Sequence, residues 1–224
     1  MTGARLGILT GAAGHIGRAT VEKFVANGWS LVITDVSDAV EEIARNAARE
    51  HGTTVIGVQA DIAREDDAVR VAALAANAGQ PVTFLGLIAG INHEAAPVDQ
   101  IDMDMWDRVF SINLRANVLM MKHCVPLLRA SGGGAIATTS SWWGRAAHPY
   151  FSAYCASKAG VIALTQSAAG ELAPESGSIE MPKGLRIGQV AQEAPGTEQT
   201  LLEVVLAADT ERTALLAEAE TATD

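Results

Sequence analysis

The sequence predicts an α/β fold of the Rossmann type, with helices on both faces of a doubly wound parallel sheet. Over the first two thirds of the 224 residues, short apolar runs alternate with helical stretches, which is typical of a parallel sheet buried on both faces. The first apolar run also ends in a glycine-rich turn that enters a helix, as in dinucleotide-binding folds. No run of about 18 apolar residues occurs, so we expect no membrane span.

Five strands are expected in chain order, at Leu6–Leu9, Leu31–Thr34, Thr54–Val58, Thr83–Ile88 and Ala135–Thr139. The helices are expected from the glycine turn to Asn27, from Ser37 to Glu50, and over Glu65–Ala78, Met103–Arg129 and Ser152–Leu172. Asn27-Gly28 resembles a helix stop, and Ser37-Asp38 resembles an N-cap. Because crossovers between parallel strands are right-handed, these elements predict a doubly wound sheet.

Charge divides the chain unevenly. Residues 1–170 hold 15 acidic and 13 basic side chains, whereas residues 171–224 hold 11 acidic and 3 basic ones. We therefore expect one domain over residues 1–174 and an atypical segment over 175–224, with a strand candidate at Leu185–Val190 and an acidic helix at about Gln199–Thr221. The net charge of −10 argues against a nucleic-acid partner. Two cysteines are too few for a disulfide framework, so we expect a cytoplasmic location.

The turn after the first strand reads TGAAGHIG, with Gly11, Gly14 and Gly17 at a strand-to-helix junction. Glycines there let backbone amides approach a pyrophosphate, and the helix N-terminus adds a partial positive charge. A glycine pattern alone is weak support, because tight turns have the same composition. The preceding strand, the following helix and an acid after the second strand together favour a dinucleotide site.

That acid is Asp35, which lies 18 residues beyond Gly17. A carboxylate there can accept hydrogen bonds from two ribose hydroxyls and would repel a 2′-phosphate, so NAD is expected rather than NADP. No Lys or Arg lies within the glycine loop to offset that repulsion. The alternative is that Asp35 only caps the second helix. Asp61, after the third strand, could contact the adenine or could serve as a turn or N-cap residue.

The strongest local pattern is Tyr154-Cys-Ala-Ser-Lys158. Residues i and i+4 share a helix face, so the phenol and the ammonium are neighbours. The cation favours the phenolate, which can exchange a proton with an alcohol or carbonyl oxygen while hydride moves to or from nicotinamide. Ser141 lies 13 residues earlier, where its hydroxyl could bind the substrate oxygen. Asn113 lies in the long expected helix, and the alternative for it is an exposed polar residue or one that bonds local backbone.

In family order, these elements resemble a short-chain dehydrogenase/reductase of the single-domain kind, over residues 1 to about 170. The matching elements are TGAAGHIG, Asp35, Asp61-Ile62, IAG at 88–90, Asn113, Ser141 and YCASK. The resemblance implies that Tyr154 is the general acid/base and that Lys158 stabilises its phenolate and holds the nicotinamide ribose. It further implies that Ser141 positions the substrate and that Asn113 supports a proton-relay water.

The same resemblance implies a small alcohol or ketone as substrate and no metal site. The cofactor contacts that it implies are Gly11, Gly14, His15, Ile16, Gly17, Asp35, Asp61, Ile62, Ala89, Gly90, Tyr154 and Lys158. Because the helices around 103–129 and 152–172 commonly build a family interface, we expect a homodimer at most. The alternative function is a non-catalytic nucleotide-binding chimera that lacks the substrate-binding C-terminal region.

The chain departs from the family pattern at two places. His15 stands where a glycine is typical, and Leu87-Ile88-Ala89-Gly90 replaces the family's N-N-A-G, so the asparagine contacts are absent. The residues between Ser141 and Tyr154 either line a substrate pocket or pack under the loop or at a subunit contact; the aromatic and histidine members are Trp142, Trp143, His148, Tyr150 and Phe151. Cys155 is expected to be a small buried residue rather than a nucleophile.

From Ala169 onward, the sequence resembles a second family, the ATP-binding cassette proteins of the ABC-F kind. The run AGELAPESGSIEMP, the strand candidate after it and Gln192 at a Q-loop position carry this resemblance. No G-x-x-x-x-G-K-[ST] occurs anywhere in the chain, which excludes an ATPase. We therefore interpret the chain as a dehydrogenase domain joined to a cassette-like segment; the alternative is a divergent dehydrogenase C-terminus.

Overall fold

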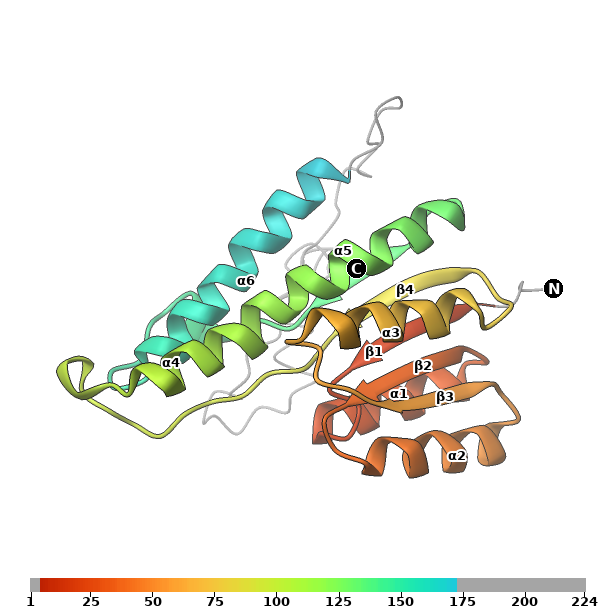
Figure 1. The fold of residues 1–224 in the computed structure, drawn as a ribbon, viewed down its shortest axis with the longest axis horizontal. Helices are drawn as coiled ribbons and strands as arrows, with labels where there is room; N and C mark the ends of the chain where they lie inside the picture. Colours follow the sequence, from red (N-terminus) through yellow and green to blue (C-terminus); the bar gives the residue numbers. More distant parts are fainter. Residues whose placement is uncertain (1–4, 173–224) are drawn as a thin grey trace, which may run out of the picture. The chain divides into compact units, whose positions relative to one another are not determined.

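The computed structural model describes residues 5–172, which belong to one compact unit, Met1–Ala173 (Figure 1). The atypical segment over 175–224 lies outside the described residues, together with its strand candidate, its acidic helix and Gln192. The sequence also predicts that the sheet is incomplete at its C-terminal end, and this prediction likewise concerns residues outside the described part of the chain.

The described residues form a five-stranded parallel sheet with the strand order β3-β2-β1-β4-β5. The strands are β1 Leu6–Thr10, β2 Ser30–Asp35, β3 Val55–Gln59, β4 Val82–Leu87 and β5 Ala135–Thr138. The helices are α1 His15–Ala26, α2 Ala39–His51, α3 Glu65–Ala76, α4 Met103–Phe110, α5 Ala116–Ala130 and α6 Ser152–Glu171. Two short 3₁₀ turns, η1 Val98–Gln100 and η3 Trp142–Gly144, lie in the connections. The predicted α/β class and parallel sheet are confirmed.

Apolar side chains on both faces of the central strands explain why helices cover the sheet twice. Leu6 and Ile8 of β1 belong to a buried cluster with residues of α3 and α5. Their neighbour Leu9 belongs to a second cluster, with residues of α1 and α2. Because successive side chains of a strand point to opposite faces, one buried strand supports both cores. Figure 1 shows α3 and α5 on the opposite side of the sheet from α1 and α2.

The strand order reverses between β1 and β4, and this reversal positions the site. The chain moves from β1 toward β3 in one direction and then returns to place β4 on the other side of β1. In open parallel sheets, the loops that leave the carboxyl ends of the two strands at such a reversal part and leave a crevice. The glycine turn after β1 and the IAG segment after β4 both leave the sheet there.

The long helix expected over Met103–Arg129 is wrong as a single α-helix. A π-helical segment, Ser111–Arg115, separates α4 from α5. A π segment inserts an extra residue into a helix, and such segments are frequent at functional sites. The buried side chain of Asn113 lies in this segment and makes hydrogen bonds to residues outside the helix. No glycine or proline occurs from Met103 to Val125, so the sequence contains no signal for the interruption.

At the edge of the sheet, β5 pairs with β4 and with no other strand of the described part of the chain.

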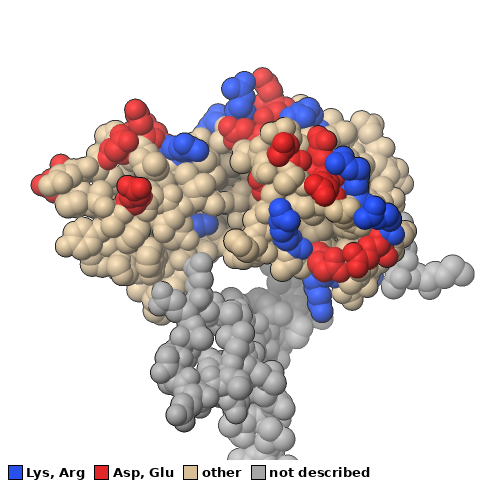
Figure 2. Space-filling model, turned by 90° about the horizontal axis from the view of Figure 1, so that it is seen from below, with Lys and Arg blue, Asp and Glu red and all other residues tan. Residues whose placement is uncertain are grey.

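The space-filling view in Figure 2 shows acidic and basic side chains intermixed on the face that it presents, rather than a surface of one sign. Among the described helices, none has the length and apolar character needed to cross a membrane.

Candidate active site

The glycine turn packs tightly against the segment that follows β4. Gly11 has a φ of +67°, and a Cβ atom there would lie 2.8 Å from the backbone of Ala89. A Cβ atom on Gly17 would lie 2.0 Å from the carbonyl oxygen of Gly11. Gly14 precedes α1 as its N-cap residue, and no described side chain caps the helix from that position. The start of the helix therefore keeps backbone N–H groups for a ligand.

A cleft of about 940 Å³ opens beside this turn. Ten of the twelve predicted cofactor residues line it: Gly11, Gly14, His15, Ile16, Gly17, Asp35, Asp61, Ile62, Ala89 and Gly90. The sequence reasoning missed the remaining lining residues, which are Ala13, Arg18, Thr34, Val36, Ser37, Ala60, Ala63, Ile88, Ile91, Arg108, Ser111 and Ile112. Most of these adjoin a predicted residue in sequence, so proximity was a usable signal. Arg108 adjoins none of the predicted residues.

Asp35 is the last residue of β2, and its side chain binds the glycine turn. Its carboxylate accepts hydrogen bonds from the backbone N–H of Ala13 at 2.9 Å and from that of Ser37 at 3.0 Å. The alternative in which Asp35 caps the second helix is wrong, because α2 begins at Ala39 with Asp38 as its N-cap residue. The carboxylate thus lies in the cleft with its orientation fixed by two backbone donors.

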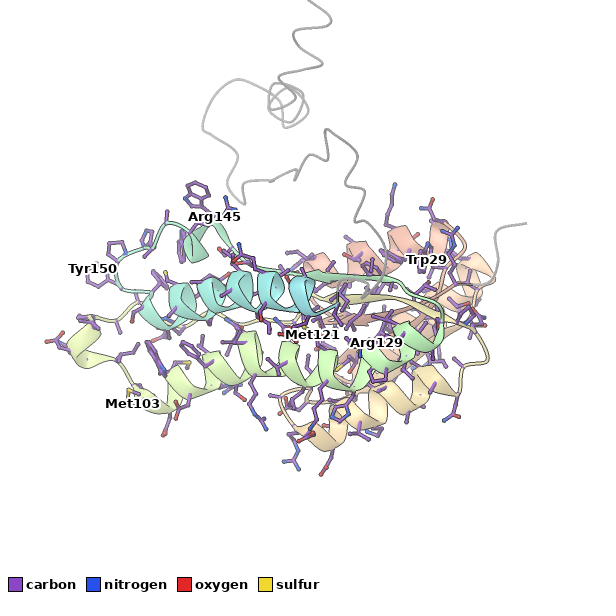
Figure 3. The ribbon with its side chains drawn as sticks, turned by 90° about the horizontal axis from the view of Figure 1, so that it is seen from above. Trp29, Met103, Met121, Arg129, Arg145 and Tyr150 are labelled. Carbon is purple, nitrogen blue, oxygen red and sulfur yellow. The ribbon has the colours of Figure 1, made fainter. Side chains whose placement is uncertain are left out.

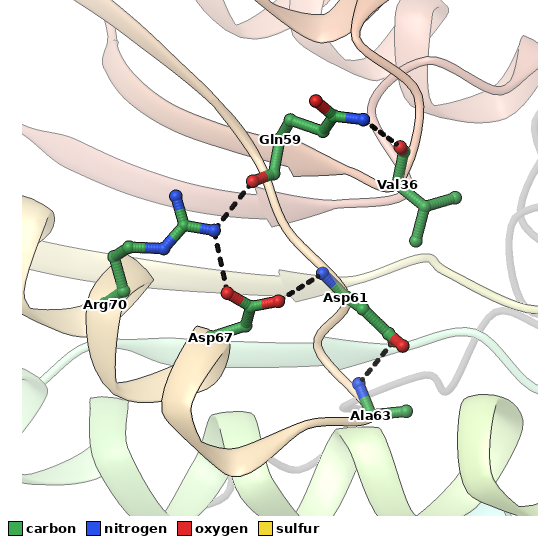
Figure 4. Close-up of polar contacts among 6 residues, drawn as sticks. All are labelled: Val36, Gln59, Asp61, Ala63, Asp67 and Arg70. Carbon is green, nitrogen blue, oxygen red and sulfur yellow. Dashed lines mark hydrogen bonds and ion pairs between the residues drawn. The ribbon is translucent and has the colours of Figure 1, made fainter.

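Asp61 serves as a turn residue and also lines the cleft. Its carboxylate accepts a hydrogen bond from the N–H of Ala63, while its own N–H donates to Asp67 at 2.8 Å (Figure 4). Asp67 in turn accepts a hydrogen bond from Arg70, which also donates to the carbonyl of Gln59. The Arg70 hydrogen bond is the main reason that the pKa of Asp67 is lowered. This network fixes the turn between β3 and α3.

Lys158 is buried on α6 beside the phenol ring of Tyr154. Its Nζ lies 5.7 Å from the centre of that ring and donates a hydrogen bond of 2.8 Å to the carbonyl of Thr139. The side chain is 3% exposed, and burial lowers the pKa of Lys158 to about 8. At neutral pH the ammonium form therefore predominates, next to the tyrosine that the sequence singled out.

Asn113 is fully buried, so the alternative of an exposed helix residue is wrong. Its side-chain oxygen accepts from the N–H of Ile91 at 2.8 Å, and its amide donates to the carbonyl of Ile91 and to the hydroxyl of Ser157. The backbone carbonyl of Asn113 accepts a hydrogen bond from the side chain of Asn117. Asn113 thus ties the segment after β4 to α6, the helix that carries Tyr154 and Lys158.

The connection between β5 and α6 carries Ser141 and the aromatic residues. The hydroxyl of Ser141 accepts from the N–H of Trp143 at 3.2 Å. The ring of Trp143 packs against His148, Phe151 and Tyr154, with centroid distances of 4.5, 4.9 and 5.9 Å. Figure 3 shows Tyr150 at the end of this connection, next to the start of α6. The rings of Trp143, His148, Phe151 and Tyr154 pack on one another, and none of these four lines the cleft.

The expected catalytic residues lie outside the lining of the cleft but next to its end. Gly90 joins the two regions, because a Cβ atom there would lie 3.1 Å from Lys158 Nζ and 3.2 Å from Asn113 Oδ1. Ser140, the neighbour of Ser141, donates its hydroxyl to the carbonyl of Lys158 at 2.7 Å. Cys155 is buried, as expected.

One group of described side chains could offer ligands to a metal. Glu22, Glu50 and His51 place one ligand atom each within 4.8 Å of one another. None of the three lines the cleft, and His51 already contacts Glu22 at 2.7 Å. The hydrogen bond between His51 and Glu22 accounts for this arrangement.

Comparison with known proteins places the chain among dehydrogenases. The sequence model described as short chain dehydrogenase matches residues 6–182. A cis-4-hydroxycyclohexanecarboxylate dehydrogenase of Sinomonas cyclohexanicum is 35% identical over 209 residues, or 93% of this chain and 79% of that protein. An NAD+-bound xylitol dehydrogenase superposes with a TM-score of 0.72 at 29% identity, covering 78% of this chain and 67% of the other. An archaeal alcohol dehydrogenase from Thermococcus sibiricus, complexed with 5-hydroxy-NADP, shares the fold with a TM-score of 0.71 at 21% identity, covering 75% of this chain and 71% of the other.

These comparisons give no support to the cassette resemblance. The dehydrogenase match continues to residue 182, past the boundary expected at residue 174. An alignment over 93% of the chain also enters the segment that was assigned to the second family.

Proposed function

Since this chain belongs to the short chain dehydrogenase family, a family of oxidoreductases, we propose that it interconverts a secondary alcohol and a ketone with NAD as hydride carrier. One observation carries the proposal. The buried Nζ of Lys158 lies beside the ring of Tyr154 and also beside Gly90, at the end of the nucleotide cleft. A proton-transfer pair therefore adjoins a site with the features of a dinucleotide cradle.

The residues present fit a nicotinamide dinucleotide. The helix α1 starts without a described side-chain cap, and its first residues line the cleft. A pyrophosphate placed there would receive backbone N–H groups and the positive end of the helix dipole. Gly14 keeps the approach open, because a Cβ atom there would find its nearest neighbour only at 3.4 Å. When bound, the nicotinamide supplies the acceptor or donor of hydride.

NAD is the proposed form of the cofactor because of Asp35. Its carboxylate lines the cleft at the end of β2, where it would accept ribose hydroxyls and repel a 2′-phosphate. Arg18 also lines the cleft, and its Nε donates to the carbonyl of Ala13 at 2.8 Å. If the proposal is correct, Asp35→Ser reduces the preference for NAD over NADP at least about tenfold in dissociation constants, because it removes the repelling charge. An unchanged ratio would contradict the assignment.

Tyr154 is the proposed general acid/base, with Lys158 beside it as the ammonium that favours its phenolate. During oxidation, the phenolate oxygen accepts the proton of the alcohol; during reduction, the phenol returns it. Ser141 positions the substrate oxygen through its hydroxyl. Asn113 supports a proton-relay water through its backbone carbonyl, which has a second lone pair besides the one that Asn117 uses.

The proposed substrate is a small secondary alcohol or the matching ketone. The relative from Sinomonas is named for a ring alcohol that also carries a carboxylate, and the xylitol dehydrogenase is named for a polyol. Both support an alcohol that has a second polar group.

The test uses the two tyrosines of the chain as a matched pair. Purified protein is mixed with NAD and a panel of secondary alcohols, and reduced nicotinamide is followed by absorbance. Tyr154→Phe should lower kcat at least about a hundredfold, because general acid–base catalysis contributes that much or more. Tyr150→Phe removes the other, exposed phenol hydroxyl and should leave kcat unchanged. Turnover that persists in Tyr154→Phe would refute the mechanism, whereas NAD binding without any turnover would favour the non-catalytic alternative.

A homodimer is proposed for the assembly. Figure 1 and Figure 3 both show α6 alongside α4 and α5, so the helices of the expected interface lie next to one another. Light scattering of the purified full chain should give the mass of two chains. A monomer at all concentrations would contradict the proposal.

A further inference from the structure

The segment that follows β4 runs against the connection that precedes α6. Gly90 lies beside Lys158, and the N–H of Ala96 donates to the carbonyl of Tyr150 at 3.0 Å. Between these two contacts, the ring of His93 packs against Phe151 at a centroid distance of 5.6 Å. His93 therefore lies on a segment that starts in the lining of the cleft, passes Lys158 at Gly90 and then packs against the start of α6 at Phe151.

The hydrogen bonds of His93 define the state of its imidazole. Its Nδ1 lies 2.7 Å from the carbonyl oxygen of Glu94. A carbonyl oxygen can only accept, so Nδ1 carries the proton and donates it. In the neutral ring, the other nitrogen, Nε2, is then an acceptor with a free lone pair. The residue is 9% exposed, and Nε2 is buried with no hydrogen-bond partner among residues 5–172.

A buried acceptor without a partner destabilises a fold, so each such atom requires an explanation. Here the unpaired nitrogen lies in the group of rings that includes Tyr154. Phe151 contacts His93, Trp143 contacts Phe151, and Tyr154 contacts Trp143. The rings of Phe151 and Trp143 thus lie between His93 and the proposed acid/base.

We propose that His93 is a specificity-determining residue whose Nε2 accepts a hydrogen bond from a second hydroxyl group of the alcohol substrate. The inference rests on the proposed oxidoreductase function. An acceptor nitrogen selects an O–H donor over a ketone oxygen or a carboxylate, which have no proton to donate at neutral pH. The reacting hydroxyl is assigned to Tyr154 and Ser141, so the group that meets His93 is a different one.

The arrangement also indicates where the second hydroxyl lies on the substrate. The rings of Phe151 and Trp143 connect His93 with Tyr154 in a chain of contacts. Because two rings lie between His93 and Tyr154, the second hydroxyl is expected on the far side of the substrate rather than on the carbon next to the reacting carbon. Because Nε2 is buried, a substrate hydroxyl can reach it only when neighbouring side chains move, and such side-chain changes are common on binding.

The experiment compares cyclohexanol with the cyclohexanediol whose hydroxyls lie on opposite carbons. We expect the unmodified full chain to oxidise the diol with a kcat/KM roughly ten times that for cyclohexanol or more, because a site built to bind a hydroxyl discriminates against a substrate that lacks it. His93→Phe should reduce this ratio to near one, mainly through the KM of the diol. His93→Gln, whose side-chain oxygen is also an acceptor, should restore part of the ratio, which a merely structural role would not do.

His148→Phe is the matched control, since this histidine belongs to the same group of rings but is exposed. This variant should keep the diol-to-cyclohexanol ratio of kcat/KM that the unmodified chain has. A diol-to-cyclohexanol ratio of kcat/KM that stays the same in His93→Phe would overturn the inference. A hydroxycyclohexane carboxylate preferred over the diol would overturn it as well, because it would require a donor at His93.

A second measurement separates this inference from the proposed function. The shift in Tm that each alcohol causes is recorded on NAD-saturated protein, which requires no turnover. If neither alcohol is oxidised, the proposed function fails, but a larger shift by the diol that disappears in His93→Phe still supports His93 as its ligand. Equal shifts by the two alcohols in the unmodified chain would overturn the inference irrespective of activity.

Discussion

Replacing Lys158 with methionine should change how the free energy of unfolding depends on pH. The direction of the change follows from the burial of the ammonium group. Burial lowers the pKa of Lys158 from its ordinary value of 10.5 to about 8 in the folded protein. Between these two values, the unfolded chain binds more protons than the folded one, so the free energy of unfolding rises with pH. Lys158→Met removes this contribution. The stability of the unmodified chain should therefore rise relative to that of the variant across this window.

The magnitude follows from the two pKa values. Going from about pH 7 to about pH 9.5, the difference in unfolding free energy between the unmodified chain and Lys158→Met should grow by roughly 2 kcal/mol in favour of the unmodified chain. The lost hydrogen bond to the carbonyl of Thr139 adds an offset that does not vary with pH in this range. The pH dependence of the difference, rather than its value at one pH, is therefore the informative quantity.

The assay is urea denaturation followed by circular dichroism, in the absence of nicotinamide nucleotides, at several pH values across this range. Lys122→Met is the control, because it removes a lysine that is 59% exposed in its side chain and thus tests for the loss of one surface charge. A difference between Lys158→Met and the unmodified chain that stays constant from about pH 7 to about pH 9.5 would refute the reasoning. It would mean that the ammonium is well solvated or paired in the folded protein.

Three further perturbations test other parts of the described unit. Gly17→Ala should lower the free energy of unfolding, measured in urea, by about 1–3 kcal/mol, because its Cβ would overlap the carbonyl of Gly11. Gly14→Ala should change this free energy by less than about 0.5 kcal/mol. Equal effects of the two substitutions would contradict the close packing of Gly17 on Gly11. Burial raises the pKa of Cys124 to about 12, so iodoacetamide at about pH 8 should label it only after unfolding, as read by peptide mass spectrometry. The lysine and histidine of α5 lower the pKa of Glu65, so its contribution to stability is present above its ordinary value of 4.5 and is lost as pH falls through the lower folded value. Urea midpoints of Glu65→Gln and the unmodified chain should therefore converge as the solution is acidified, and a constant gap would argue against the ion pair.

The strands and most helix ends could be predicted because their causes are local. β1 and β2 are continuous apolar runs, and a run of this kind identifies a strand buried on both faces without knowledge of its neighbours. Asn27-Gly28 ends α1 as expected, since Gly28 adopts a φ of +76° that favours glycine. Differences at the other ends amount to one or two residues, which is the usual uncertainty of helix and strand boundaries.

The features that the sequence did not reveal depend on contacts between distant residues. The π segment forms where Asn113 bonds Ile91, 22 positions earlier in the chain. The packing of His93 on Phe151 joins residues that no motif connects. The aromatic residues before Tyr154 could be seen in the sequence, but their choice between lining a pocket and packing together depends on how the connection folds. The cassette resemblance rested on the run AGELAPESGSIEMP, the strand candidate after it and Gln192, and the comparisons with known proteins give it no support.

Two side chains from other elements make hydrogen bonds to the segment after β4, where the family's asparagines are absent. The hydroxyl of Thr10, at the end of β1, accepts hydrogen bonds from the N–H groups of Ile88 and Ala89 at 3.0 and 3.2 Å. Asn113 binds both backbone groups of Ile91. Between these anchors lies Gly90, which has Lys158 Nζ as its close neighbour. The segment that lines the cleft and the helix that carries Tyr154 and Lys158 are thus joined by hydrogen bonds. The glycine turn is connected to the surroundings of Lys158 in the same way, because Thr10 at the end of β1 binds the start of this segment.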